Sequence, residues 1–288
     1  MDTPRSATPA SHLAASDILR VMTYNIRFDY EPDGVNRWPN RRRAVTDLIR
    51  HEDADVVGLQ EVLPHQLDDI RADLSDIYDI VAVARADSRP GGGDRMTILF
   101  RRTRFEAVEH GGFWLSQTPE IPGSVGWDAS APRNAAWTRL RHRASSSSSG
   151  HLPDVFVCCT HLDHLGGEAR VNGAKLIRQR MTALTRDLPL LVMGDFNTEP
   201  HEAPHAAMTD TATSAPLSDA AASNGAPSRP TYYGFDGLGD ALRSEPAVLD
   251  YIFHNHRLAI TGYTVVETRN GIYYPSDHLP VVATFRFG

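Results

Sequence analysis

Short apolar runs of strand length recur along almost the whole chain, and this spacing restricts the fold more than any other feature. Several runs alternate apolar with polar residues and several are rich in β-branched side chains, as β-strands are. Between some of them lie stretches with the i, i+3, i+4 spacing of amphipathic helices. The runs are 18–24, 54–60, 78–84, 96–102, 135–142, 154–160, 188–194, 248–254, 259–267 and 280–287, and the helical stretches are 41–51, 64–75 and 168–186. Strands that outnumber helices in this order predict two packed sheets with helices on the outer faces, a layered α/β sandwich.

The rest of the chain predicts one domain behind a flexible tail. A chain of 288 residues buries about 75% of its unfolded surface and needs no covalent staples. Residues 1–17 are rich in Ser, Ala, Thr and Pro and are expected to be a flexible N-terminal tail. The serine-rich stretch 145–150 reads as a hairpin loop and 209–230 as a long surface loop. Neither flanks a second core, so 18–288 is expected to form a single domain.

Composition excludes several classes of protein. The net charge of −7 argues against a surface made for long nucleic acid, because backbone binding depends on Lys and Arg. The cluster Arg41–Arg43 is expected on a solvated helix face. Cys158 and Cys159 are adjacent in a predicted strand, point to opposite faces and are expected to pack rather than pair.

Targeting signals are not visible either. No apolar run approaches the about 18 residues that a membrane span requires, and the N-terminal residues have no signal-peptide core. We therefore expect a cytoplasmic protein with no membrane association. Nothing in the sequence indicates an obligate protein partner.

Polar residues suited to a hard metal and a phosphate stand beside six of the apolar runs. Taken alone, each signal is weak, and the first would indicate no more than a turn. The segments are VMTYNIRFD with Asn25, VVGLQEV with Gln60 and Glu61, CCTHLDHLGGEAR with His161, Asp163 and His164, LLVMGDFNTEP with Asp195 and Asn197, LDYIFHN with Asp250, and YPSDHLPVVATF with Asp277 and His278.

Two of these segments carry the strongest indications. In LLVMGDFNTEP, Gly194 lets the backbone turn, and Asp195 and Asn197 are expected to share a face because they are two residues apart. Asp250 lies inside an apolar strand, where a carboxylate costs several kcal/mol unless it is paired, so a partner is implied.

The mixture predicts phosphoester hydrolysis. Carboxylate oxygens select hard cations such as Mg²⁺ or Mn²⁺, which polarise a phosphoryl oxygen. Asp195 is the candidate that holds the attacking water, and Asn197 can donate its amide to a nonbridging oxygen. A protonated His278 would stabilise the developing charge, with Asp250 keeping it protonated and oriented.

A zinc hydrolase is the alternative metal enzyme. The stretch THLDHLGG resembles the metallo-β-lactamase signature T-H-x-H-x-D-H-x-G-G. One His-x step is missing, however, so that only His161, Asp163 and His164 remain. The loss changes the ligand geometry that zinc requires.

The motifs QE, TH, GDFN, LDYI and SDH, in this order, resemble those of the endonuclease/exonuclease/phosphatase family, which is deoxyribonuclease I-like. The resemblance runs from about Leu19 to Phe287. It implies a four-layer αββα sandwich of two mixed sheets flanked by helices, in agreement with the pattern of apolar runs. It also implies a Mg²⁺- or Mn²⁺-dependent phosphoesterase with one or two ions.

The resemblance further implies a role for each motif residue. Asn25, Glu61 and Asp277 match the positions that hold the metal. His161 and Asn197 match positions that contact the phosphate, and Asp195 matches the residue that activates water or binds a second ion. Asp250 and His278 match the Asp–His pair of the family.

Other stretches resemble a bacterial and fungal branch of the family whose substrate is undefined. Five residues in or beside them are candidates for lining a substrate pocket, with bracing of the loops as the equal alternative: Trp38, Arg133, Asp163, His164 and Arg170. Asp94 stands roughly where an acidic partner for His161 would lie.

Three functions follow, in this order. The first is hydrolysis of a phosphodiester, in a nucleic-acid end or a small molecule. The second is hydrolysis of a phosphomonoester on a sugar, inositol or nucleotide. The third, a nucleic-acid-binding protein without catalysis, is disfavoured by the acidic net charge.

Overall fold

The computed structural model describes residues 17–85, 93–143, 152–213, 216–235, 245–267 and 274–288. All of the expected tail except Asp17 lies outside the described residues, as does the serine-rich loop at 145–150. Among the described helices, none is both long and apolar enough to cross a membrane. The expectation of a single domain stays a prediction.

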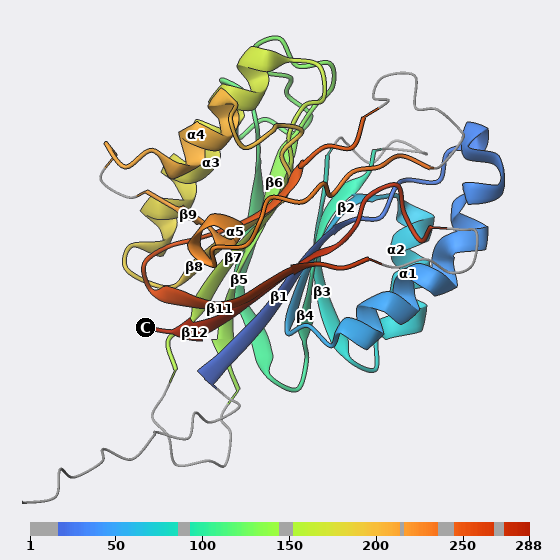
Figure 1. The fold of residues 1–288 in the computed structure, drawn as a ribbon, viewed down its shortest axis with the longest axis horizontal. Coiled ribbons are helices and arrows are strands. Elements are labelled where there is room, and N and C mark those ends of the chain that lie inside the picture. The colour runs from blue at the N-terminus through green and yellow to red at the C-terminus, as the bar shows by residue number, and fades with distance from the viewer. Residues whose placement is uncertain (1–16, 86–92, 144–151, 214–215, 236–244, 268–273) are drawn as a thin grey trace, which may run out of the picture.

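Two six-stranded sheets lie face to face in the middle of the molecule (Figure 1). The first sheet has the order β11(Leu258–Val265), β12(Val281–Phe287), β1(Ile18–Asn25), β2(Val56–Val62), β4(Arg95–Arg101), β3(Tyr78–Ala84). The second has the order β5(Phe105–Trp114), β6(Asn134–His142), β7(Val155–His161), β8(Leu190–Asp195), β10(Asp250–His254), β9(Ser218–Asp219).

Helices cover both outer faces, so the predicted four-layer αββα sandwich is confirmed (Figure 1). Helices α1(Trp38–Glu52) and α2(Pro64–Leu74) pack on the first sheet, with Val45 and Ile49 of α1 fully buried. Helices α3(Gly167–Thr185) and α4(Ala203–Thr209) pack on the second. The other two described helical elements are short: η2(Glu31–Asn36) and α5(Ala220–Ser223). A third apolar cluster fills the space between the sheets.

Each sheet contains one parallel pair of strands. In the first sheet β1 runs parallel to β2, and in the second β7 runs parallel to β8. A parallel pair needs a crossover connection, and α1 and α3 supply these two crossovers. The register places Asn25 opposite Gln60 and His161 opposite Asp195, so both pairs end in polar residues.

Several parts of the chain differ from the sequence expectations, among them η2 and α4, which were not expected, and two further segments. Strand β5 was not expected, because its sequence FEAVEHGGFW contains two glycines. In the structure most of its residues are half-exposed. The prediction of a continuous loop over 209–230 is wrong at 218–223, where β9 pairs with β10 and α5 follows. There Asp219 caps the short helix by accepting a hydrogen bond from the Ala221 amide at 2.8 Å.

Gly194, near the end of β8, lies where the sheet leaves no space for a side chain. Its φ is +152°, and a Cβ atom there would lie 2.0 Å from the carbonyl oxygen of Thr160 in β7. We expect Gly194→Ala to lower the free energy of unfolding by at least about 3 kcal/mol, because backbone must move in both strands. Urea unfolding measures the change. Gly262→Ala is the matched control, since its Cβ would lie 3.7 Å from Thr284, and equal losses would contradict the explanation.

Candidate active site

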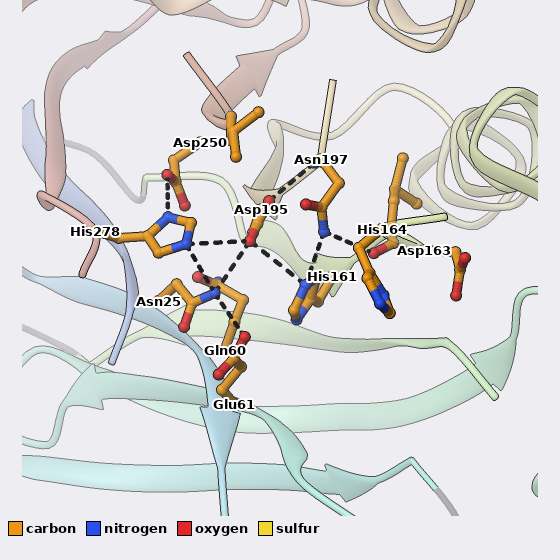
Figure 2. Close-up of polar contacts among 12 residues, drawn as sticks. Asn25, Gln60, Glu61, His161, Asp163, His164, Asp195, Asn197, Asp250 and His278 are labelled. Atoms are coloured by element: carbon orange, nitrogen blue, oxygen red, sulfur yellow. Dashed lines mark hydrogen bonds and ion pairs between the residues drawn. The ribbon is translucent and has the colours of Figure 1, made fainter. Parts of the chain in front are cut away.

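The two parallel pairs deliver their end residues to one place between the sheets (Figure 2). Asn25 ends β1 and Asp195 ends β8. The Asn25 amide nitrogen donates to Asp195 Oδ2 at 3.0 Å and to Glu61 Oε1 at 3.2 Å. One buried amide therefore connects carboxylates that come from different sheets.

Unusual backbone conformations orient the side chains of Glu61 and Asn197 toward the site. Glu61 has φ +64° and Asn197 has φ +47°, both in the left-handed region that residues other than glycine rarely adopt. At Glu61 the pairing of β2 with β4 shifts register between Leu59 and Val62, as at a β-bulge. Bulges and strained residues of this kind redirect side chains at functional sites.

Asp250 and His278 form a buried ion pair. His278 Nδ1 lies 2.8 Å from Asp250 Oδ2, which also accepts a hydrogen bond from the Thr231 hydroxyl at 2.7 Å. Burial alone would lower the pKa of His278, but Asp250 and Asp195 outweigh it and raise this pKa to about 10. The imidazole is therefore a cation at neutral pH, with the partner that the buried Asp250 was expected to have.

Asp195 lies on the other side of the same ring. Its Oδ2 is 3.7 Å from His278 Nε2 (Figure 2). Burial, with a smaller contribution from Asp250, raises the pKa of Asp195 to about 7. Asp195, Asp250 and His278 offer ligand atoms within 4.8 Å of one another. A protonated imidazole repels a cation, however, and we interpret the three as an acid–base line, with a hydrogen bond from His278 to Asp250 and an ion pair to Asp195, instead of a metal site.

The metal candidates Glu61 and Asp277 face the same cavity. Glu61 Oε2 accepts a hydrogen bond from the Phe28 amide at 3.0 Å, and Asp277 Oδ2 lies 3.7 Å from Arg27 Nη1. Burial would raise the pKa of Glu61, but Arg27 and the Phe28 amide lower it. Burial raises the pKa of Asp277, and Glu61 adds to this shift. A half-buried and a buried carboxylate on one cavity wall are a donor set suited to a hard divalent cation.

Asn25 is oriented differently from the other two metal candidates. Its Oδ1 accepts a hydrogen bond from the Arg27 amide at 3.0 Å, and its amide nitrogen, not its oxygen, faces Glu61. Asn25 therefore positions Glu61 through a hydrogen bond. Its predicted role as a metal ligand stays a prediction.

His161 and Asn197 stand beside Asp195 on the second sheet. The Asn197 amide donates to His161 Nε2 at 3.0 Å and to the Leu162 carbonyl at 3.1 Å. Burial and the nearby Arg133 hold the pKa of His161 well below its usual value. Nε2 also lies 3.4 Å from Asp195 Oδ2, and Nδ1 has no hydrogen-bond partner among the described residues. The site thus combines one cationic and one neutral histidine.

A single cavity of about 790 Å³ contains most of these groups. Its wall includes Glu61, His161, Asp195, Asn197, Asp277 and His278. Of the five residues expected at a substrate pocket, Arg133 and His164 line it. Sequence reasoning did not assign a pocket role to Arg27, Phe28, Tyr30, Arg85 and Tyr232, which line it too. Arg27 and Phe28 lie inside the segment VMTYNIRFD and Tyr30 follows it directly, so their closeness to Asn25 in the sequence was the available signal.

The other three pocket candidates lie behind the cavity wall. Asp163 accepts hydrogen bonds from the Gly166 amide at 2.7 Å and the Ser130 hydroxyl at 2.8 Å, and so braces its own loop. Arg170 donates to the Asp163 carbonyl at 3.2 Å. Trp38 is 1% exposed and its indole donates to Asp69 on α2 at 2.9 Å, in the outer layer.

Asp94 does not have the partner that was expected of it. The structure pairs Asp94 with Arg85 at 2.8 Å, and no ion pair joins it to His161 within the described part of the chain. Both Asp94 and Arg85 line the cavity. Asp94 therefore lines the cavity as the partner of Arg85 and not of His161.

Arg41 holds two distant loops around the site. Its expected place on a solvated helix face is wrong, since it is 2% exposed. Its Nη1 donates to the carbonyls of Ile26 at 2.8 Å and Pro275 at 2.7 Å, and its Nη2 donates to that of Arg27 at 3.1 Å. These carbonyls flank the Asn25 and Asp277 segments, which Arg41 therefore ties together.

The two mixed sheets with flanking helices match those of structures in the deoxyribonuclease I-like superfamily. The sequence profile of the Endonuclease/Exonuclease/phosphatase family matches residues 22–278. The chain belongs to this family, and it is therefore a member of a family of hydrolases.

Similar proteins include structures from two Bacteroides species. A family member from Bacteroides vulgatus is 27% identical, covers 94% of this chain and 99% of its own, and has a TM-score of 0.84. A mannosyl-6-phosphatase from Bacteroides thetaiotaomicron is 29% identical, covers 93% and 100%, and has a TM-score of 0.80. A probable RNA exonuclease from Saccharomyces cerevisiae is 26% identical over 72% of this chain and 43% of its own length. The chain spans from 17% to 72% of the length of the curated relatives that it matches.

The buried ion pair leads to a stability prediction. Asp250→Ala leaves the imidazolium of His278 buried without its partner, and we expect the free energy of unfolding to fall by about 3–5 kcal/mol at pH 7. Urea unfolding measures the loss. The control is Asp187→Ala, which removes an exposed ion pair with Arg257 and should have little effect. A small loss for Asp250→Ala would mean that His278 is neutral when buried.

Proposed function

We propose that the protein is a divalent-metal-dependent phosphoesterase. The observation that supports this best is the line Asp250–His278–Asp195 in the same cavity as Glu61 and Asp277. It sets an acid–base system beside a pair of carboxylates suited to a hard cation. Glu61 and Asp277 would hold Mg²⁺ or Mn²⁺, which when bound supplies polarisation of a phosphoryl oxygen.

The chain's own residues then divide the remaining work. Asp195, with a pKa of about 7, accepts a proton from the attacking water in its ionised form, as a general base poised near neutral pH does. The cationic His278 stabilises charge on the phosphoryl oxygens, and Asp250 keeps it protonated. His161 and Asn197 position the phosphate from the second sheet.

The ester that we propose first is a phosphomonoester of a small molecule. A cavity of about 790 Å³ falls within the about 300–1,000 Å³ of small-ligand sites. The similarity to the mannosyl-6-phosphatase covers both chains almost completely. This reverses the order that the sequence suggested. A phosphodiester, including a nucleic-acid end, is the second candidate because of the similarity to the probable RNA exonuclease.

Removal of the acid–base residues tests the reaction. We expect Asp195→Ala and His278→Ala each to lower kcat at least about 100-fold, since proton transfer and charge stabilisation are lost. Release of phosphate from a phosphomonoester and of product from an aryl phosphodiester is measured with Mg²⁺, Mn²⁺ or EDTA. Asp68→Asn, on the exposed face of α2, is the control. Hydrolysis that is insensitive to EDTA would overturn the proposed mechanism.

Metal binding can be tested without substrate. We expect Glu61→Gln to weaken the affinity for Mn²⁺ at least about tenfold, because a charged oxygen ligand is lost. Calorimetric titration of the purified protein with Mn²⁺ measures the affinity. Glu120→Gln, which changes an exposed glutamate, should leave it unchanged. Equal affinities in the wild type and Glu61→Gln would remove Glu61 from the proposed metal site.

A further inference from the structure

Two buried charged residues of the cavity wall have hydrogen-bonding capacity that the described residues do not use. Asp94 lies directly before β4 of the first sheet and is 4% exposed. Arg133 lies directly before β6 of the second sheet and is 5% exposed. Both line the cavity that contains Asp195 and His278. They therefore reach it from opposite sheets.

Asp94 keeps free acceptor capacity. Its Oδ1 forms an ion pair with Arg85 Nε at 2.8 Å, but neither carboxylate oxygen accepts a well-aligned hydrogen bond from a described residue. A carboxylate can accept about four hydrogen bonds. Buried polar atoms are nearly always satisfied, so an unused one in a cavity wall points to a ligand or to water.

Arg133 keeps a free donor. Its Nη2 contacts His164 Nδ1 at 3.0 Å and its Nε lies 3.4 Å from Asp163 Oδ2. Its Nη1 has no hydrogen-bond partner among the described residues. Two of its three nitrogens are therefore fixed by contacts within the protein, and the third remains for a ligand.

Asp94 and Arg133 each pair with another residue of the protein, Asp94 with Arg85 and Arg133 with Asp163. Burial raises the pKa of Asp94, and Arg85 and Arg133 both oppose that shift. Asp94 and Arg133, both described residues, form no ion pair with each other. A group that contacted both would accept a hydrogen bond from Arg133 and donate one to Asp94.

This combination favours a ligand that both donates and accepts hydrogen bonds. Arg85 and Arg133 together outweigh the charge of Asp94, so charge alone does not select the ligand, but a group with acceptors only would leave Asp94 without a hydrogen bond. A hydroxyl group carries one donor and two acceptor positions and satisfies both residues while remaining neutral. The rings of Phe28 and Tyr30, which line the same cavity, supply apolar surface for the carbon atoms between such hydroxyls.

We propose that Asp94 and Arg133 form a hydroxyl-binding subsite, and that the group bearing the phosphoester is a sugar or another polyol. The proposal rests on the proposed function for the position of the phosphate, beside Asp195 and His278. It adds the class of the leaving group, which none of the metal or acid–base residues specifies. Arg85 is a positioning residue, since it acts through Asp94.

Binding of two matched phosphates tests the subsite. Mannose 6-phosphate and n-hexyl phosphate both carry six carbons and a phosphomonoester, but only the sugar carries hydroxyls. Calorimetric titration in EDTA gives both dissociation constants without a need for turnover. We expect the wild type to bind the sugar phosphate at least about tenfold more tightly, as hydrogen bonds to charged groups allow. In Asp94→Ala and Arg133→Met this ratio should approach one, and Asp94→Asn, which keeps an acceptor, should be intermediate.

The controls separate the possible failures. Asp154→Ala removes another buried aspartate, which pairs with Arg139 at 2.7 Å away from the cavity, and should retain the wild-type ratio. Thermal melting shows whether each variant is folded. Equal binding of both phosphates by the wild type, or an unchanged ratio in folded Asp94→Ala and Arg133→Met, would overturn the subsite. Hydrolysis is assayed separately, so that a preference for the sugar without hydrolysis would sink the proposed function and leave the subsite standing.

Discussion

The hydrogen bond from the Asn25 amide to Asp195 is the interaction on which the site depends. Asn25 ends β1 in the first sheet and Asp195 ends β8 in the second, and the two residues are 3.0 Å apart. A close approach of this kind requires the two sheets to pack at one spacing and one angle. The apolar cluster between them, with Val21, Val157 and Met193, supplies that packing. Positions in the core therefore control the distance between the groups that we propose to act on one phosphate.

The balance of charge around this contact follows from burial. Removal of carboxylates from water favours their neutral form, as the raised pKa values of Asp195 and Asp277 illustrate. Fixed cations oppose this effect and favour the charged carboxylates. His278 lies beside Asp195, and Arg27 lies beside Glu61 and Asp277. Each cation is itself held by an acid, Asp250 for His278 and Asp33 for Arg27. The site is thus a set of linked pairs in which no charge is isolated.

The sequence predicted the layers and the motif residues because both depend on local patterns. Apolar runs followed by polar residues mark strand ends, and strand ends meet at one edge whatever the loops do. Burial that depends on distant segments was not predictable. Arg41 has the local pattern of a solvated helix residue, but segments outside its helix, those of Ile26 and Pro275, pack against it and bury it. Trp38 was expected to line the pocket because of the motif in which it lies. Instead α2 covers it, and its indole donates a hydrogen bond to that helix. The orientation of the Asn25 amide likewise depends on Glu61, 36 residues away.

The place of β1 in its sheet has a consequence for synthesis of the protein. β1 lies between β2 and β12, and the carbonyl of Asn25 accepts a hydrogen bond from Ser276, 251 residues further along the chain. During translation one edge of β1 stays without its antiparallel neighbour until β12 leaves the ribosome. An unpaired apolar edge attracts other strands. This edge of the nascent chain therefore stays exposed until residues 281–287 have been made, and no product that lacks them can complete the first sheet.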